Sequence, residues 1–109
     1  MKRNKKRLAA LGLAAAMALG SALTSFAGEW RQDSIGWWYL KDDGSYLTDT
    51  FWDDANGYTY YFTGRGYMVT GWKMIQNNWY YFDENTGAMW KNGQTPDGNW
   101  VGADGIWVQ

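Results

Sequence analysis

Paired tryptophans recur along the chain at a fixed spacing, with tyrosines close behind the second member of each pair. Trp30 and Trp37 are seven residues apart, and so are Trp72 and Trp79. The faces of Trp and Tyr rings are electron-rich, so they attract quaternary ammonium groups through cation–π contacts. They also stack on the apolar C–H faces of sugars. The rings therefore indicate two ligand classes, organic cations and carbohydrates, which composition alone does not separate.

Adjacent acidic residues are the other groups that could do chemistry, and they form three pairs: Asp42 with Asp43, Asp53 with Asp54, and Asp83 with Glu84. A glycosidase needs two carboxyl groups that face each other across a sugar. Neighbouring residues in predicted turns suit local backbone hydrogen bonding instead. The chain also has no histidine and no cysteine, so zinc and thiol chemistry lack their usual groups. The sequence predicts a noncatalytic protein without a metal or cofactor.

Residues 1–27 have the pattern of a secretory signal peptide. The basic stretch "MKRNKKR" precedes an apolar run from Leu8 to Leu23, and "SFA" places small residues before a cleavage point. The apolar run has 16 residues, which is shorter than the roughly 20 that span a bilayer. We therefore expect cleavage after Ala27, export, and no stable membrane insertion after cleavage.

Residues 28–109 would then carry five basic and eleven acidic residues, a formal charge of −6. Nucleic acids require a basic surface, so they are not expected as partners. Leu, Ile, Val and Phe account for only 11 of these 82 residues. The nine Trp and eight Tyr supply the missing apolar surface, because each can bury about 150 to 250 Å². The composition predicts one small domain with an aromatic core.

An internal repeat of about 20 residues organises this domain. Trp30, Trp52 and Trp72 begin three similar units, at spacings of 22 and 20 residues. Each unit has a short run, a turn, an aromatic run and a second turn. A glycine in each second turn is expected to adopt a positive φ, namely Gly44, Gly66, Gly87 and Gly105. The prediction is an all-β fold, a short solenoid of stacked β-hairpin repeats over 29–50, 51–70 and 71–89, with a divergent terminal unit over 90–109.

The stretch "GWKMIQNNWYYFDENTGAM" at 71–89 resembles the cell-wall-binding, or choline-binding, repeats of Gram-positive bacteria and the related glucan-binding repeats. The resemblance extends more loosely over 30–108. It implies a spiral of hairpins with ligand sites between successive hairpins. Each such site would combine two tryptophans of one repeat with a tyrosine of the next, often with a methionine nearby.

Aligning the repeats assigns the rings to three junctions between hairpins. The expected ligand-binding residues are Trp30, Trp37 and Tyr61 at the first junction, Trp52 and Tyr81 at the central one, and Trp72, Trp79 and Trp100 at the last. Thr59 stands where the central junction needs its second tryptophan, so we expect a weak or absent site there. Strand alternation places Tyr80 and Phe82 in the core.

The sequence thus predicts a secreted, wall-associated, noncatalytic module that binds choline-bearing teichoic acid or another wall or surface glycan. The alternative is a structural or oligomeric surface repeat protein without a small ligand. Dimerisation through an exposed hairpin end stays open.

Overall fold

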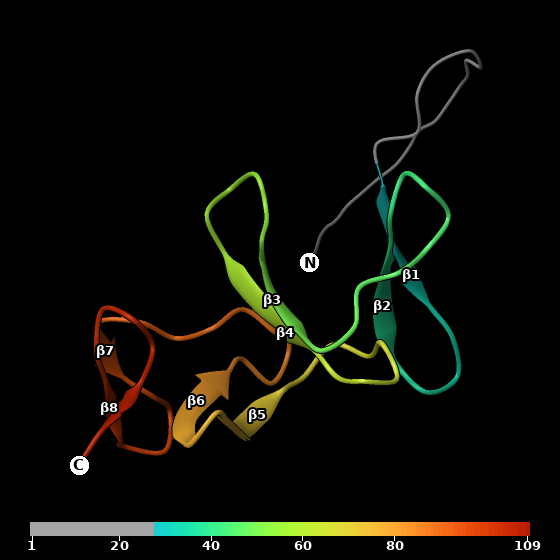
Figure 1. Ribbon diagram of the computed structural model, residues 1–109. Coiled ribbons are helices and arrows are strands. Elements are labelled where there is room, and N and C mark those ends of the chain that lie inside the picture. The colour runs from blue at the N-terminus through green and yellow to red at the C-terminus, as the bar shows by residue number, and fades with distance from the viewer. Residues whose placement is uncertain (1–27) are drawn as a thin grey trace.

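The computed structural model describes residues 28–109, so the expected signal peptide and its cleavage point lie outside the described residues. Nine β-strands make up this part of the chain, and every strand pairing is antiparallel (Figure 1). The predicted all-β fold of antiparallel hairpins is therefore confirmed. No helix among residues 28–109 is long and apolar enough to cross a membrane.

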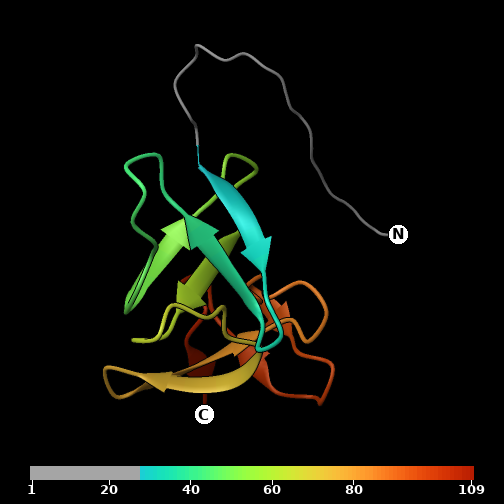
Figure 2. The same cartoon turned by 90° about the vertical axis from the view of Figure 1, so that its right-hand side faces the viewer.

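Three two-stranded hairpins are followed by a three-stranded terminal unit. The strands are β1 (Glu29–Gln32), β2 (Trp37–Leu40), β3 (Thr50–Asp53), β4 (Thr59–Phe62), β5 (Gly71–Ile75), β6 (Asn78–Phe82), β7 (Gly93–Gln94), β8 (Trp100–Val101) and β9 (Trp107–Val108). The strands of successive hairpins run in different directions, as Figure 2 shows. The molecule is elongated, with extents of 50 × 28 × 26 Å.

The acidic pairs lie in or beside the turns, as the sequence predicts. Asp43 accepts a hydrogen bond from the Ser45 backbone N–H at 2.9 Å, and Asp83 accepts one from the Asn85 N–H at 2.8 Å. Asp54 does the same for two backbone N–H groups in the turn between β3 and β4. These carboxylates therefore stabilise turns, which is the role that their adjacency in the sequence favours.

Neighbouring repeats are joined by a short segment after each hairpin. The Met68 N–H donates to the Trp37 carbonyl of the preceding hairpin at 2.7 Å, and the Met89 N–H donates to the Thr59 carbonyl at 2.8 Å. The side chains in this segment cover a glycine of the next repeat. A Cβ on Gly66 would lie 2.7 Å from the Tyr46 ring, and one on Gly105 would overlap the Met89 side chain.

The glycines predicted to need a positive φ do have one. The φ angles of Gly44, Gly66, Gly87 and Gly105 lie between 79° and 92°. The structure adds a second reason at the last three positions, because only a residue without Cβ leaves room for the preceding repeat. A Cβ on Gly44 would meet nothing within 4 Å, so the requirement there is one of backbone conformation alone.

The core is small and built around two phenylalanines. Phe62 and Phe82 are fully buried, and Phe82 packs with Val69 and Ile75. Tyr80 is partly buried against the same cluster. The core position predicted for Phe82 is confirmed, and Tyr80 lies at the edge of the cluster.

The second hairpin differs from its neighbours by one residue in register. Trp30 pairs with Tyr39, and Trp72 pairs with Tyr81, but Trp52 pairs with Tyr60, one position earlier in the aromatic run. The loop between β3 and β4 has five residues, whereas the other two loops have four and two. When a hairpin loop has an odd number of residues, the midpoint of the strand pairing falls on a residue. When the number is even, the midpoint falls between two residues, so the partners of each strand residue differ by one position. A shift of one residue exchanges the faces of a strand, so Trp52 lies on the face opposite to the one expected.

Candidate functional site

An open cavity of about 290 Å³ lies between the third hairpin and the terminal unit. Its lining side chains are Trp72 on β5, Trp79 on β6, Trp107 on β9, and Asn99 just before β8. This volume is at the small end of the range for ligand pockets, about 300 to 1,000 Å³. The cavity is thus sized for a small group and is walled mainly by aromatic rings.

Strand alternation brings the two tryptophans of the third hairpin to one face. Trp72 pairs with Tyr81 and Met74 pairs with Trp79, so these side chains all lie on the same side of the hairpin. Trp79 keeps 37% of its surface exposed. The Trp72 and Trp107 rings have centroids 6.4 Å apart and planes at 68°. Two nearly perpendicular ring walls form a corner that can contact a rounded organic cation on two sides.

Hydrogen bonding and burial hold the Trp72 wall in place. The Trp72 Nε1–H donates to Asp97 Oδ2 at 2.8 Å. Hydrogen bonds from the Thr95 hydroxyl and then from Trp72 hold the pKa of the Asp97 carboxyl below its usual value. Tyr81 is buried and packs against Trp72, with ring centroids 5.1 Å apart. Burial raises the pKa of Tyr81, and the negative charges of Glu84 and Asp97 add to the effect.

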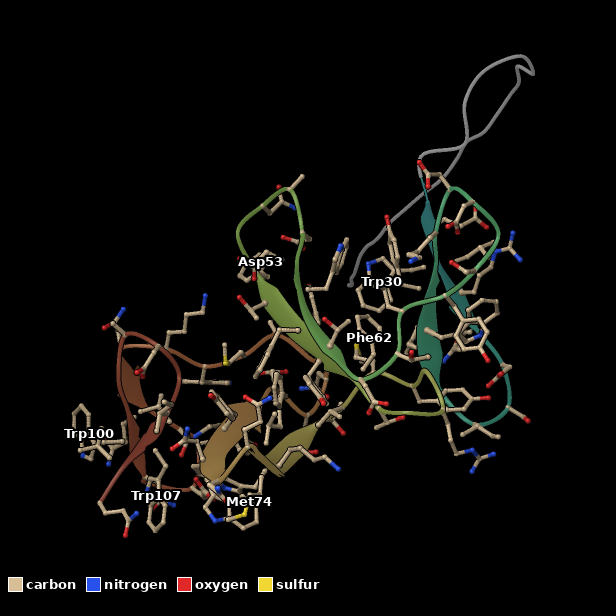
Figure 3. The ribbon with its side chains drawn as sticks, viewed as in Figure 1. Trp30, Asp53, Phe62, Met74, Trp100 and Trp107 are labelled. Atoms are coloured by element: carbon tan, nitrogen blue, oxygen red, sulfur yellow. The ribbon has the colours of Figure 1, made fainter. Side chains whose placement is uncertain are left out.

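The third ring of this site is not the residue that the alignment assigns. Trp72 and Trp79 come together as predicted, but the ring beside them is Trp107, not Trp100. Trp107 pairs with the buried Val101, whereas Trp100 pairs with Val108 on the opposite face and is 57% exposed. Figure 3 shows Trp100 on the outer edge of the terminal unit.

A signal for Trp107 is present in the sequence. Trp107 stands in the same aligned column as Met68 and Met89, whose backbones touch the preceding hairpin. Ile106, next to it, forms a bridge with Tyr80 of the third hairpin. An aromatic residue at this methionine position points to a ring placed against the preceding repeat.

At the first junction the structure brings Trp30 and Trp37 together, with centroids 6.4 Å apart and planes at 82°. The second hairpin contributes Tyr60 at 5.0 Å from Trp30, not the expected Tyr61. The same position faces the preceding hairpin in the third repeat, where the register is not shifted and Tyr80 contacts Phe51. What the register shift adds is Trp52, which it places on the same face as Tyr60 and next to Trp30. We call the resulting group the first-junction cluster; it consists of Trp30, Trp37, Tyr39, Trp52, Tyr60 and Phe62.

The rings of the first-junction cluster pack against one another, and only Trp37 at its edge is largely exposed. Tyr39 and Trp52 are only 4.3 Å apart at their centroids, which is direct ring contact and leaves no space for a ligand between them. Trp30 has five ring neighbours within 6.4 Å. Burial and the nearby Asp54 carboxylate raise the pKa of Tyr60. Figure 3 shows Trp30 and Phe62 in the space between the first two hairpins.

The central junction does not combine the two rings expected there. Trp52 belongs to the first-junction cluster and Tyr81 lies behind Trp72, so the expected Trp52–Tyr81 pairing is wrong. Phe51 instead contacts Tyr61 and Tyr80, at 4.9 and 5.2 Å.

Thr59 acts as a structural link at the central junction. Its side chain is buried, donates to Asp53 Oδ1 at 2.5 Å and accepts from Lys91 Nζ at 2.9 Å. A polar chain from the second hairpin to the terminal unit therefore occupies the position of the second tryptophan. Between residues 28 and 109 no group of three His, Cys, Asp or Glu side chains could hold a metal ion.

Two family models match this chain. The model described as "Choline-binding repeat" covers residues 50–93, and the one described as "Putative cell wall binding repeat" covers residues 28–46. No curated protein matches the chain.

Solved structures share the fold at 32 to 36% identity. The Cpl-1 endolysin complexed with a peptidoglycan analogue is 35% identical over 75% of this chain and 25% of its own, with a TM-score of 0.67. The endolysin from phage Cp-1 complexed with choline is 32% identical over 82% of this chain and 27% of its own, with a TM-score of 0.66. Choline binding protein F from Streptococcus pneumoniae is 36% identical over 73% of this chain and 26% of its own, also at 0.66.

The chain therefore spans about a quarter of the length of the solved structures that it matches. The two family models together cover most of the described residues, and the neighbours share the hairpin fold. On this ground the chain belongs to the choline-binding repeat family.

Proposed function

We propose that this protein binds choline-bearing wall polymers through the cavity formed by Trp72, Trp79 and Trp107. The observation that carries the proposal is the open corner of tryptophan rings between the third hairpin and the terminal unit. The expected export and wall association form part of the same proposal. They are supported by the leader pattern in the sequence and by the cell-wall-binding repeat match at residues 28–46.

The chemistry of the cavity suits a trimethylammonium group. Such a group has no hydrogen-bond donor and is weakly hydrated, so ring faces can replace its water at little cost. Each ring that it contacts contributes about 0.5 to 2 kcal/mol through cation–π attraction. Asn99 adds one polar side chain to the lining, suited to the oxygen end of choline.

Charge supports a cation over a neutral sugar as the bound group. Residues 28–109 carry five basic and eleven acidic residues, a formal charge of −6. Long-range attraction of this kind favours positively charged ligands. One of the matched structures, the phage Cp-1 endolysin, is complexed with choline.

A titration tests the proposal directly. Because the cavity is built of tryptophans, millimolar choline should shift the tryptophan fluorescence of the protein in a saturable way. A response to a wall polysaccharide free of choline, without one to choline, would make the ligand a glycan. No response to either would contradict ligand binding and favour a structural surface protein.

A further inference from the structure

We propose that Asp97 determines the ligand specificity of the terminal cavity, by orienting the Trp72 ring and by adding a negative charge that favours a cation over a neutral group of the same shape. This inference rests on the proposed function, because it concerns the same cavity. Asp97 does not line the cavity itself; it acts through the indole N–H of Trp72.

The hydrogen bond between Asp97 and Trp72 joins the two sides of the site. Asp97 lies in the turn between β7 and β8 of the terminal unit, and Trp72 lies on β5 of the third hairpin. The Nε1 to Oδ2 distance of 2.8 Å is that of a short, charge-assisted bond. The bond therefore fixes the position of one wall relative to the unit that carries Trp107.

The turn around Asp97 is itself well ordered by hydrogen bonds. The buried Thr95 hydroxyl donates to Asp97, and the Thr95 N–H donates to the Asn99 carbonyl at 2.7 Å. The Gly98 N–H donates to the Thr95 carbonyl at 2.9 Å. Because these hydrogen bonds already fix the Asp97 carboxylate, it orients Trp72 without a large additional loss of side-chain entropy when a ligand binds.

The charge of Asp97 lies next to the cavity, because its carboxylate oxygen is 2.8 Å from the indole nitrogen of Trp72, a residue of the lining. The Asp97 carboxylate is one of the negative charges that raise the pKa of Tyr81, whose ring packs against Trp72. Within residues 28–109 no Lys or Arg lies at ion-pair distance from Asp97, so its charge is not neutralised by a partner there. Hydrogen bonding to an anion also polarises the indole and makes its face more negative.

Two ligands of equal shape separate the effect of charge from the effect of packing. Choline carries a trimethylammonium group, and its neutral carbon isostere carries a tert-butyl group in the same place. Both can fill the space between the aromatic rings, but only the positive charge of choline is attracted electrostatically to a carboxylate. For charges about 6 Å apart, the attraction corresponds to roughly threefold in affinity in water and about tenfold at half that dielectric constant.

The experiment compares the affinities of both ligands in the wild type, Asp97→Asn and Asp97→Ala. Asparagine can still accept the Trp72 hydrogen bond, so Asp97→Asn should weaken choline about three- to tenfold and leave the isostere unchanged. Asp97→Ala frees the ring and should weaken both ligands. The indole N–H resonance of Trp72 in NMR spectra should move in both variants, since its acceptor changes.

Asp43→Asn is the matched control. Asp43 is also an exposed turn carboxylate with a lowered pKa, but it lies in the first repeat, so its loss should change choline affinity by less than twofold. Equal choline affinity in the wild type and Asp97→Asn would overturn this inference while leaving choline binding intact. Equal weakening of both ligands in Asp97→Asn would overturn the role of charge. A wild type that binds neither ligand would overturn both proposals.

Discussion

The first and last junctions each contain two tryptophans at equivalent positions of the repeat, but the rings are packed together at the first junction and border an open cavity at the last. Trp37 touches Trp30, and rings of the second hairpin cover Trp30 and Tyr39, with Tyr39 and Trp52 only 4.3 Å apart. At the last junction Trp72 instead touches Trp107, and Trp79 lines the other side of an open cavity. One junction is packed as a core, and the other is left open as a site.

The difference shows that the following repeat decides what a tryptophan pair does. The second hairpin presents Tyr60 and Phe62 to the first, and its register, shifted by one residue, adds Trp52 to the same face. The terminal unit has strands of only two residues and presents a single ring, Trp107. A pair of tryptophans therefore forms a cavity only where its neighbour supplies one ring and leaves the remaining space free.

The largest expected effect is a loss of stability in Trp30→Ala. Trp30 packs against five other rings, so its removal should lower the free energy of unfolding by about 3 kcal/mol. Urea denaturation of Trp30→Ala and Trp79→Ala checks the contrast, because the more exposed Trp79 should cost about 1 kcal/mol or less. Equal losses would mean that the first junction is not a packed core.

The contacts between a glycine of one repeat and a side chain of the preceding repeat should contribute similarly to stability at both junctions, even though the aromatic rings there are arranged differently. In Gly66→Ala and Gly105→Ala the new methyl group meets both a positive φ and a side chain of the preceding repeat, Tyr46 or Met89. We expect each to cost about 2 kcal/mol of unfolding free energy.

Gly44→Ala is the control for this pair. It has the same positive φ but no neighbour, so it should cost about 1 kcal/mol. Thermal or urea unfolding measures all three variants. A Gly44→Ala protein as unstable as Gly105→Ala would show that backbone strain alone, without the stacking contact, accounts for the glycines.

Choline affinity should depend on the last junction more than on the first, the reverse of the order expected for stability. Trp79→Ala removes one wall of the open cavity and should weaken choline by about tenfold, which is the contribution of a single well-placed ring. Trp37→Ala affects the equivalent ring of the first junction, which is 41% exposed, and should change the affinity by less than twofold. Calorimetry of both variants settles this. A loss in Trp37→Ala as large as in Trp79→Ala would place a second functional site at the first junction.

The smallest expected effect is the contribution of Tyr60, in the first-junction cluster, to the loss of stability at high pH. Burial raises the pKa of Tyr60 in the folded state above the ordinary value of 10.0, and Asp54 adds to the shift. The unfolded chain then loses this proton first, so stability that is present below pH 10 declines as the pH rises above it. Tyr60→Phe should therefore make the alkaline decline in unfolding free energy less steep, which urea denaturation at a series of pH values above 10 measures. An unchanged slope in Tyr60→Phe would contradict the buried position of this ring.

Local features of this protein follow from its sequence. The Asp-rich turns, the glycines with positive φ and the burial of Phe82 depend on residues close together in the chain, so turn chemistry and strand alternation predict them. The seven-residue spacing also places Trp72 and Trp79 on one face, as the pairing of β5 with β6 shows. The hairpins themselves are predictable from the sequence for the same reason.

Tertiary structure alone decided which rings meet across the junctions. The alignment of the repeats assigns Trp52 and Trp100 to ligand sites, but the faces of β3 and β8 on which they lie depend on the backbone pairing of these strands. A five-residue loop shifts the pairing of β3 with β4 by one residue and so turns Trp52 toward the first hairpin. The pairing of Val101 with Trp107 buries Val101 and turns Trp100 outward. Because side chains alternate with a period of two, a register shift of one residue moves a ring from the site face of a strand to the core face. The spacing of the aromatic residues within one repeat does not reveal such a shift.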